Sequence, residues 1–256
     1  MARESVSIDL NADLAEGFGR WRLTDDEGLL DVVTSANVAC GFHAGDPSTM
    51  RRVCESAAAR GVRIGAQVSY RDLAGFGRRA MDVPPRELAD EVAYQIGALR
   101  VFAQAAGSDV TYVKPHGALY NRIVWDKTQA GAVVKGILLS GGGLPVLGLP
   151  LSAVRDVAAA AGLIFVGEAF ADRAYRPDGT LLPRTEAGAV LDDADAVVQQ
   201  SVMIVTQHTV HTTSGDPIPV QVRSLCLHGD TPGAVDLAIR VRSELQDQNV
   251  TIRPFV

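Results

Sequence analysis

Short apolar runs alternate with longer segments of helical pattern along this 256-residue chain. Strands are predicted at residues 5–10, 35–40, 62–68, 110–113, 145–149, 163–166, 220–227 and 250–253. Such regular alternation is typical of a parallel sheet, because consecutive parallel strands need a crossover connection that is usually a helix. About eight strand–helix units in about 250 residues predict a single α/β domain, residues 1–256, folded as a (β/α) barrel of about seven or eight strands. A doubly wound open sheet has the same alternation and is the alternative.

Capping residues mark several helix boundaries. Asp46 followed by Pro47 predicts the start of a helix, because the carboxylate can accept from free N–H groups and proline suits the first turn. Gly61 predicts the end of the same helix, since glycine readily takes the left-handed conformation of a C-terminal cap. Thr231 followed by Pro232 predicts the start of the last long helix in the same way.

Composition disfavours several classes of partner. The chain carries 24 Lys and Arg against 30 Asp and Glu, for a formal net charge of −6. Nucleic-acid binders normally present a basic face and anionic membranes attract clusters of Lys and Arg, so neither is an expected partner. Three cysteines are too few for a disulfide framework, and no run approaches the roughly 18 apolar residues of a membrane span. We therefore expect a soluble cytoplasmic protein without a signal peptide.

Polar side chains gather directly after the predicted strands. Ligand sites of parallel α/β folds lie at the carboxyl ends of the strands, so these side chains are expected to converge. In chain order they include Asp9, Asn11, Asp13, Glu16, His43, Asp46, Gln67, Lys114, His116, Tyr120, Asn121, Glu168, Asp172, Arg173, His228 and Asp230. A single residue of this kind means little, whereas convergence from several strands indicates a ligand site.

Several of these residues have a purely structural alternative. His43 can cap the neighbouring helix, and Lys114 can extend its ammonium group to solvent. Asp9 needs a partner if it lies inside the barrel, because an unpaired buried carboxylate is costly. Lys114 and His116 are two residues apart, so on a strand they point to the same side and can together hold an anion and relay a proton. Because a residue at a strand end contributes little packing, substitution of Lys114 is expected to harm catalysis more than folding.

Two loops share the sequence Gly-Phe-Gly-Arg, at residues 17–20 and 75–78. Backbone N–H groups in such loops can form anion-binding nests, and the arginine adds a cation. Neither loop has the pattern of a nucleotide-binding P-loop or a dinucleotide fingerprint, and Gly-x-Ser-x-Gly is absent from the sequence. The sequence therefore contains no recognisable ATP-binding motif and no hydrolase nucleophile of that type.

Five ordered blocks of the sequence are similar to one known family. They cover residues 8–17 (IDLNADLAEG), 35–46 (SANVACGFHAGD), 113–121 (VKPHGALYN), 170–184 and 226–230 (CLHGD). Through them the chain resembles the LamB/YcsF lactam-utilisation family, whose members are also described as the A subunit of 5-oxoprolinase. The resemblance implies a distorted barrel, often seven-stranded, related to the glycoside hydrolase/deacetylase superfamily. One departure is Gln67, where many relatives have histidine, and glutamine is a poor transition-metal ligand or proton carrier.

The resemblance also implies an activity, the opening of 5-oxo-L-proline to L-glutamate with ATP as co-substrate and with subunits B and C as partners. The catalytic candidates are Asp13, His43, Lys114, His116 and His228. Histidine can transfer protons near neutral pH, and arginine can grip an anionic substrate in bidentate fashion. The residues expected to bind substrate are Asp9, Asn11, Glu16, Asp46, Gln67, Arg78, Arg79, Tyr120, Asn121, Asp172, Arg173 and Arg184.

Two other functions stay open at this point. A metal-dependent amide hydrolase would use Asp13, His43 and either His116 or His228 as ligands of a divalent metal, although Gln67 weakens this interpretation. A non-catalytic scaffolding subunit is the other alternative. It is disfavoured because a scaffold has no need for polar groups that converge on strand ends.

Overall fold

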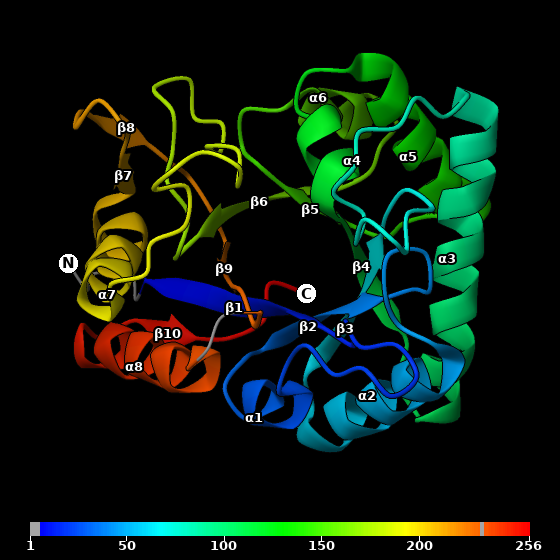
Figure 1. The fold of residues 1–256 in the computed structure, drawn as a ribbon, viewed down its shortest axis with the longest axis horizontal. Coiled ribbons are helices and arrows are strands. Elements are labelled where there is room, and N and C mark those ends of the chain that lie inside the picture. Colours follow the sequence, from blue (N-terminus) through cyan, green and yellow to red (C-terminus); the bar gives the residue numbers. More distant parts are fainter. Residues whose placement is uncertain (1–5, 231–232) are drawn as a thin grey trace.

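Seven parallel strands close into a barrel within residues 6–230 and 233–256, the part of the chain that the computed structural model describes (Figure 1). In order around the barrel they are β1 (Ser7–Leu14), β2 (Ser35–Ala39), β3 (Arg63–Val68), β4 (Val110–Pro115), β5 (Val146–Gly148), β6 (Phe165–Phe170) and β9 (Ser224–Leu227). Strand β1 pairs in parallel with both β2 and β9, which closes the sheet. The prediction of a closed barrel is confirmed, and the open-sheet alternative is wrong.

Helices cover the outside of the barrel (Figure 1). They are α1 (Asp26–Leu30), α2 (Pro47–Arg60), α3 (Pro85–Ala105), α4 (Gly117–Arg122), α5 (Lys127–Leu139), α6 (Ala153–Ala160), α7 (Ala194–Val202) with its π-helical continuation η1 (Met203–Gln207), and α8 (Ala234–Asp247). Strand β10 (Thr251–Ile252) pairs with the amino end of β1. An antiparallel hairpin of β7 (Thr209–His211) and β8 (Pro217–Pro219) was not predicted. Among the helices described, none is long and apolar enough to cross a membrane.

Local signals set the ends of α2 as predicted. The Asp46 carboxylate accepts hydrogen bonds from two backbone N–H groups of the first turn, and Gly61 ends the helix with a φ of 68°. These ends depend on neighbouring residues alone, which explains why the sequence could predict them. The predicted cap at Thr231 and Pro232 lies outside the described residues, and α8 begins at Ala234.

Strand β1 is longer than predicted. It continues to Leu14, beyond the expected end at residue 10. Asp9, Asn11 and Asp13 alternate with buried apolar residues, and all three are themselves buried. Alternation of this kind is the pattern of a strand with two different faces, and here the polar side chains face the inside of the barrel, where Asn11 contacts Ser224 and Lys114.

Candidate functional site

The polar interior of the barrel begins with Asp9, near the amino end of β1. Its carboxylate accepts hydrogen bonds from the hydroxyl groups of Thr34 and Ser35, both at 2.6 Å, and of Ser224. Burial raises the pKa of Asp9 to about 6 despite these hydrogen bonds. Asp9 therefore has the hydrogen-bond partners that a buried carboxylate needs. It lies near the amino ends of the strands, away from the carboxyl ends where the site is expected.

Lys114 lies in the middle of this interior rather than at the surface. Its Nζ is 2.9 Å from Glu168 Oε2 and 3.4 Å from Asp13 Oδ1. The same Nζ also donates to Asn11 Oδ1 at 3.0 Å and to Cys226 Sγ at 3.1 Å. Burial alone would lower the pKa of Lys114, but Asp13, Cys226 and Glu168 raise it well above its usual value. Because Lys114 lies between two buried carboxylates, we expect its substitution to lower stability as well as activity, which revises the expectation based on its position at a strand end.

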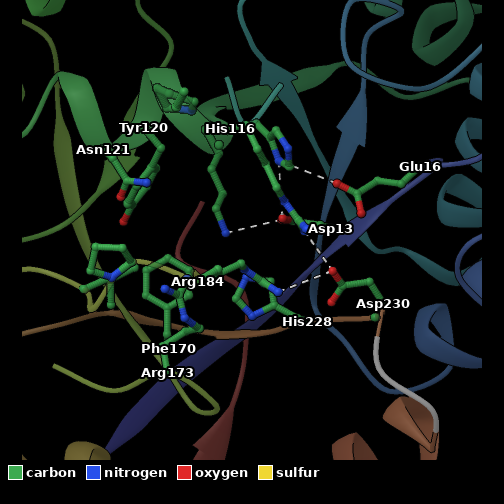
Figure 2. Close-up of a pocket in the computed structure, with 18 of the residues that line it drawn as sticks. Asp13, Glu16, His116, Tyr120, Asn121, Phe170, Arg173, Arg184, His228 and Asp230 are labelled. Atoms are coloured by element: carbon green, nitrogen blue, oxygen red, sulfur yellow. Dashed lines mark hydrogen bonds and ion pairs between the residues drawn. The ribbon is translucent and has the colours of Figure 1, made fainter. Parts of the chain in front are cut away.

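A cavity of about 340 Å³ opens above Lys114 at the carboxyl ends of the strands. It is lined by Asp13, Glu16, Arg78, Lys114, Pro115, His116, Gly117, Ala118, Tyr120, Asn121, Phe170, Arg173, Leu181, Pro183, Arg184, Thr185, His228, Gly229 and Asp230. Figure 2 shows Glu16, Asp13 and Asp230 toward one side of the cavity, with Tyr120, Asn121, Phe170 and Arg173 toward the other. Its volume lies in the range of about 300–1,000 Å³ that is usual for small-molecule sites.

His116 is held in one tautomer by the loop before α3. Its Nε2 lies 3.0 Å from the Phe76 carbonyl oxygen, which can only accept, so Nε2 carries the proton. In the neutral ring Nδ1 is then the acceptor, 3.0 Å from Gln67 Nε2 and 3.6 Å from Glu16 Oε1. Burial, with Asp13 nearby, raises the pKa of Glu16 well above its usual value. The protonated form of Glu16 is therefore favoured beside the His116 ring at the cavity wall.

His228 is held in the opposite tautomer by a carboxylate. Its Nδ1 is 2.8 Å and 3.0 Å from the two Asp172 oxygens, so Nδ1 donates and Nε2 is the acceptor in the neutral ring. Burial alone would raise the pKa of Asp172, but His228 and nearby arginines hold it below its usual value. The ring stacks on Phe170, with centroids 5.5 Å apart. An imidazole that is oriented by a buried carboxylate is a common general base.

A carboxylate and two imidazoles gather near the base of the cavity. The ligand atoms of Glu16, His43 and His116 all lie within 4.8 Å of one another. The two imidazole rings are nearly parallel, however, at 11° with centroids 3.9 Å apart. A metal lies in the plane of each imidazole that binds it, so two stacked rings cannot both direct a lone pair at one ion.

The Gln67 amide also bridges one nitrogen atom of each of these rings. Its Oε1 is 3.2 Å from His43 Nε2, and its Nε2 is 3.0 Å from His116 Nδ1. Asp13, which the sequence placed in a metal site, instead contacts Lys114 and accepts from Asn37. As arranged, these side chains do not form one coordination site for a divalent metal, and no chemical step is assigned to such an ion.

Arginine side chains form another part of the cavity wall. Arg78 Nη2 is 2.8 Å and Arg184 Nη1 is 3.5 Å from the same oxygen of Asp230. Arg173 is buried beside them. The cavity thus combines proton-transferring groups with a region of positive charge.

Comparisons with known proteins agree with this architecture. The LamB/YcsF family model matches residues 8–256. The chain belongs to the LamB/YcsF family. A relative from Streptomyces avermitilis, named as the A subunit of 5-oxoprolinase, is 71% identical over 97% of this chain and 99% of its own length. A relative with the same name from Mycobacterium leprae is 58% identical over 97% of this chain and 98% of its own length.

Solved structures agree as well. A lactam utilization protein from Thermus thermophilus has a TM-score of 0.92 and 38% identity, covering 97% of this chain and all of the other. A putative cellobiose-phosphate cleavage protein from Enterococcus faecalis shares the fold alone, with a TM-score of 0.53 and 11% identity over 97% of each chain.

In this LamB/YcsF protein most residues selected from the sequence come together. Those that line the cavity are Asp13, Glu16, Arg78, Lys114, His116, Tyr120, Asn121, Arg173, Arg184 and His228. Asn11, Gln67 and Asp172 lie buried behind this wall and hydrogen bond to it, and His43 lies behind it and hydrogen bonds to Gln67. Asp9, Asp46 and Arg79 are placed elsewhere, since Arg79 pairs with Asp72 and Asp46 caps α2.

The sequence patterns assign no role to three groups that shape the site. Glu168 is the nearer counter-ion of Lys114, and Asp230 pairs with two arginines. The Phe76 carbonyl sets the tautomer of His116. The strand-end rule that selected His228 also reaches Asp230, but a backbone carbonyl has no signal in the sequence.

Proposed function

We propose that this chain is the A subunit of an ATP-dependent 5-oxoprolinase, and that its cavity is the hydrolytic site. The reaction opens 5-oxo-L-proline to L-glutamate while ATP becomes ADP and phosphate, together with subunits B and C. Relatives that are 58–71% identical carry the name of this subunit. The observation that carries the hydrolytic assignment is the Asp172–His228 pair. It leaves His228 Nε2 as an acceptor at a cavity that is also lined by arginine side chains.

ATP is needed because a five-membered lactam is stabilised by amide resonance and by easy ring closure. Phosphorylation of the amide oxygen makes the ring carbon electrophilic. One water then adds to that carbon, the carbon–nitrogen bond breaks with protonation of the nitrogen, and a second water releases phosphate from the resulting acyl phosphate. We assign the phosphoryl transfer to subunits B and C, because this sequence lacks a recognisable nucleotide-binding motif.

The side chains of this chain supply the proton transfers. His228 Nε2 accepts a proton from the attacking water, and Asp172 stabilises the imidazolium that forms. The ring nitrogen must gain a proton as it leaves, and the Glu16–His116 pair is placed to deliver it from the cavity wall. Lys114 favours the ionised forms of Asp13 and Glu168 beneath the cavity.

The alternatives are supported less well. A metal-dependent hydrolase needs ligands that converge on one ion, and the stacked imidazoles do not provide them. A scaffold does not need a buried cation and two oriented histidines around one cavity, and burying charges without a function is costly.

The test is glutamate formation and phosphate release by this chain alone and by the complex with subunits B and C, with and without ATP. We expect turnover by the complex and little by the isolated chain. His228→Ala should lower turnover of the complex on the order of 10²–10⁴-fold, since it removes the general base. The control is His211→Ala, which changes an exposed histidine of β7. Full ATP-coupled turnover by the isolated chain, or normal turnover of His228→Ala, would overturn the proposal.

A further inference from the structure

Arg173 is a buried cation with no counter-ion of its own. Its side chain follows β6 and is 6% exposed. Nε donates to the Ala189 carbonyl at 3.0 Å, and Nη2 donates to the Leu182 carbonyl at 2.5 Å. Both acceptors are neutral. Within the described part of the chain no carboxylate forms an ion pair with Arg173, and its Nη1 makes no hydrogen bond.

The neighbours of Arg173 increase this imbalance of charge. Burial and the nearby Arg184 guanidinium lower the pKa of Arg173. Asp172 attracts Arg173 and partly offsets these effects, but its carboxylate is hydrogen bonded to His228, and Asp230 is shared by Arg184 and Arg78. A buried charge is costly unless it is paired. Protein side chains therefore leave this end of the cavity with positive charge that an anion would neutralise.

The cavity offers this positive end to a small ligand. Arg173 and Arg184 both line it, and Figure 2 shows Arg173 on the side away from Glu16 and Asp230. A ligand in this cavity can therefore place an anionic group against the Arg173 guanidinium.

We infer that Arg173 is the anion-binding residue of the cavity and that, with Arg184, it holds the carboxylate of a small amide substrate. A planar guanidinium with Nη1 free and a second hydrogen on Nη2 can grip a carboxylate in bidentate fashion. Since β6 and β9 are neighbours, a ring anchored at Arg173 lies in the same cavity as His228. The identity of the ligand as 5-oxo-L-proline rests on the proposed function, whereas anion binding at Arg173 does not.

A structural role is the competing explanation. Arg173 could serve only to tie the segment of Leu182 and Ala189 to β6 through its two carbonyl contacts. In that case substitution lowers the melting temperature but leaves ligand affinity unchanged. The two roles therefore separate when each variant's ligand-induced shift in melting temperature is measured against its own ligand-free value.

The experiment uses the isolated full-length chain, with calorimetry and thermal melting in the presence of 5-oxo-L-proline, 2-pyrrolidinone or inorganic phosphate. 2-Pyrrolidinone has the same lactam ring without the carboxylate. We expect 5-oxo-L-proline to bind at least about tenfold more tightly than 2-pyrrolidinone, and Arg173→Met to weaken that binding on the order of 10–100-fold. Arg173→Lys keeps the charge and most of the packing, so it serves if Arg173→Met does not fold, and it should weaken binding about tenfold. Arg176→Met is the matched control, because Arg176 lies on the same segment, is 42% exposed and pairs with Glu186.

Each outcome decides the inference. Unchanged affinity in Arg173→Met or Arg173→Lys overturns it, as does equal binding of 5-oxo-L-proline and 2-pyrrolidinone. Binding of phosphate in place of 5-oxo-L-proline overturns the carboxylate assignment and makes Arg173 part of a phosphoryl subsite. Loss of 5-oxo-L-proline binding in the variants, beside an inactive wild-type complex, supports the anion site while the proposed 5-oxoprolinase function fails.

Discussion

Replacing Lys114 with methionine tests the electrostatic centre of the barrel. The substitution keeps most of the side-chain volume but leaves Glu168 and Asp13, whose oxygens are 2.9 Å and 3.4 Å from Nζ, without their cation. At an effective dielectric constant of about 20, each attraction amounts to about 5 kcal/mol before desolvation is subtracted. Removing one partner of a buried ion pair typically costs about 3–5 kcal/mol. Because two carboxylates share this cation, we expect Lys114→Met to lose about 5 kcal/mol at pH 7.

Urea unfolding at pH 7 and pH 5 measures this loss. The deficit should shrink at pH 5, because burial already raises the pKa of Glu168 and a carboxyl group without its cation takes up a proton more readily. Lys114→Met combined with Glu168→Gln should recover about 2 kcal/mol, since one uncompensated charge is removed. Lys135→Met, on the exposed face of α5, is the control and should change stability by less than about 0.5 kcal/mol. A loss below about 1 kcal/mol in Lys114→Met, or no recovery in the double variant, would refute the reasoning.

Other groups give further expected outcomes. Asp172→Asn should lower turnover of the complex by about 10²–10⁴-fold in steady-state assays, because His228 loses its fixed tautomer. Its melting temperature should change little. A decrease in turnover of less than about threefold would contradict this prediction. The folded-state pKa of Asp9 is about 6 against 3.8 ordinarily, so its ionisation should destabilise the fold by about 3 kcal/mol as pH rises from about 4 to 7. Asp9→Asn should remove that decrease in stability. The same pH dependence of the free energy of unfolding in Asp9→Asn and in the unchanged protein would contradict this prediction. Gly77→Ala should melt lower and turn over more slowly than Gly107→Ala. Both glycines have a positive φ, but only at Gly77 would an added Cβ lie 2.9 Å from His116 Cδ2 and from His43 Cβ.

The sequence by itself determined the features that depend on nearby residues or on a repeated pattern. The carboxylate of Asp46 and the conformational freedom of Gly61 set the ends of α2 without help from the rest of the chain. Alternating strand and helix patterns were sufficient for a parallel sheet, because parallel strands need helical crossovers, whereas the pairing of β1 with β9 decided that the sheet closes into a barrel. The strand-end rule then selected His116 and His228, which do line one cavity.

Only the tertiary structure decided what these residues contact. Lys114 donates to Asn11, 103 residues away, and Asn11 lies 157 residues from Glu168. A sequence shows which side of a strand a residue occupies but not which distant charges meet it inside a barrel. For the same reason the sequence pattern places Lys114 at a strand end near the mouth of the barrel, whereas barrel closure surrounds its ammonium group with buried carboxylates. The unpaired state of Arg173 likewise follows from where every other charge lies, and such a balance exists only once the chain has folded.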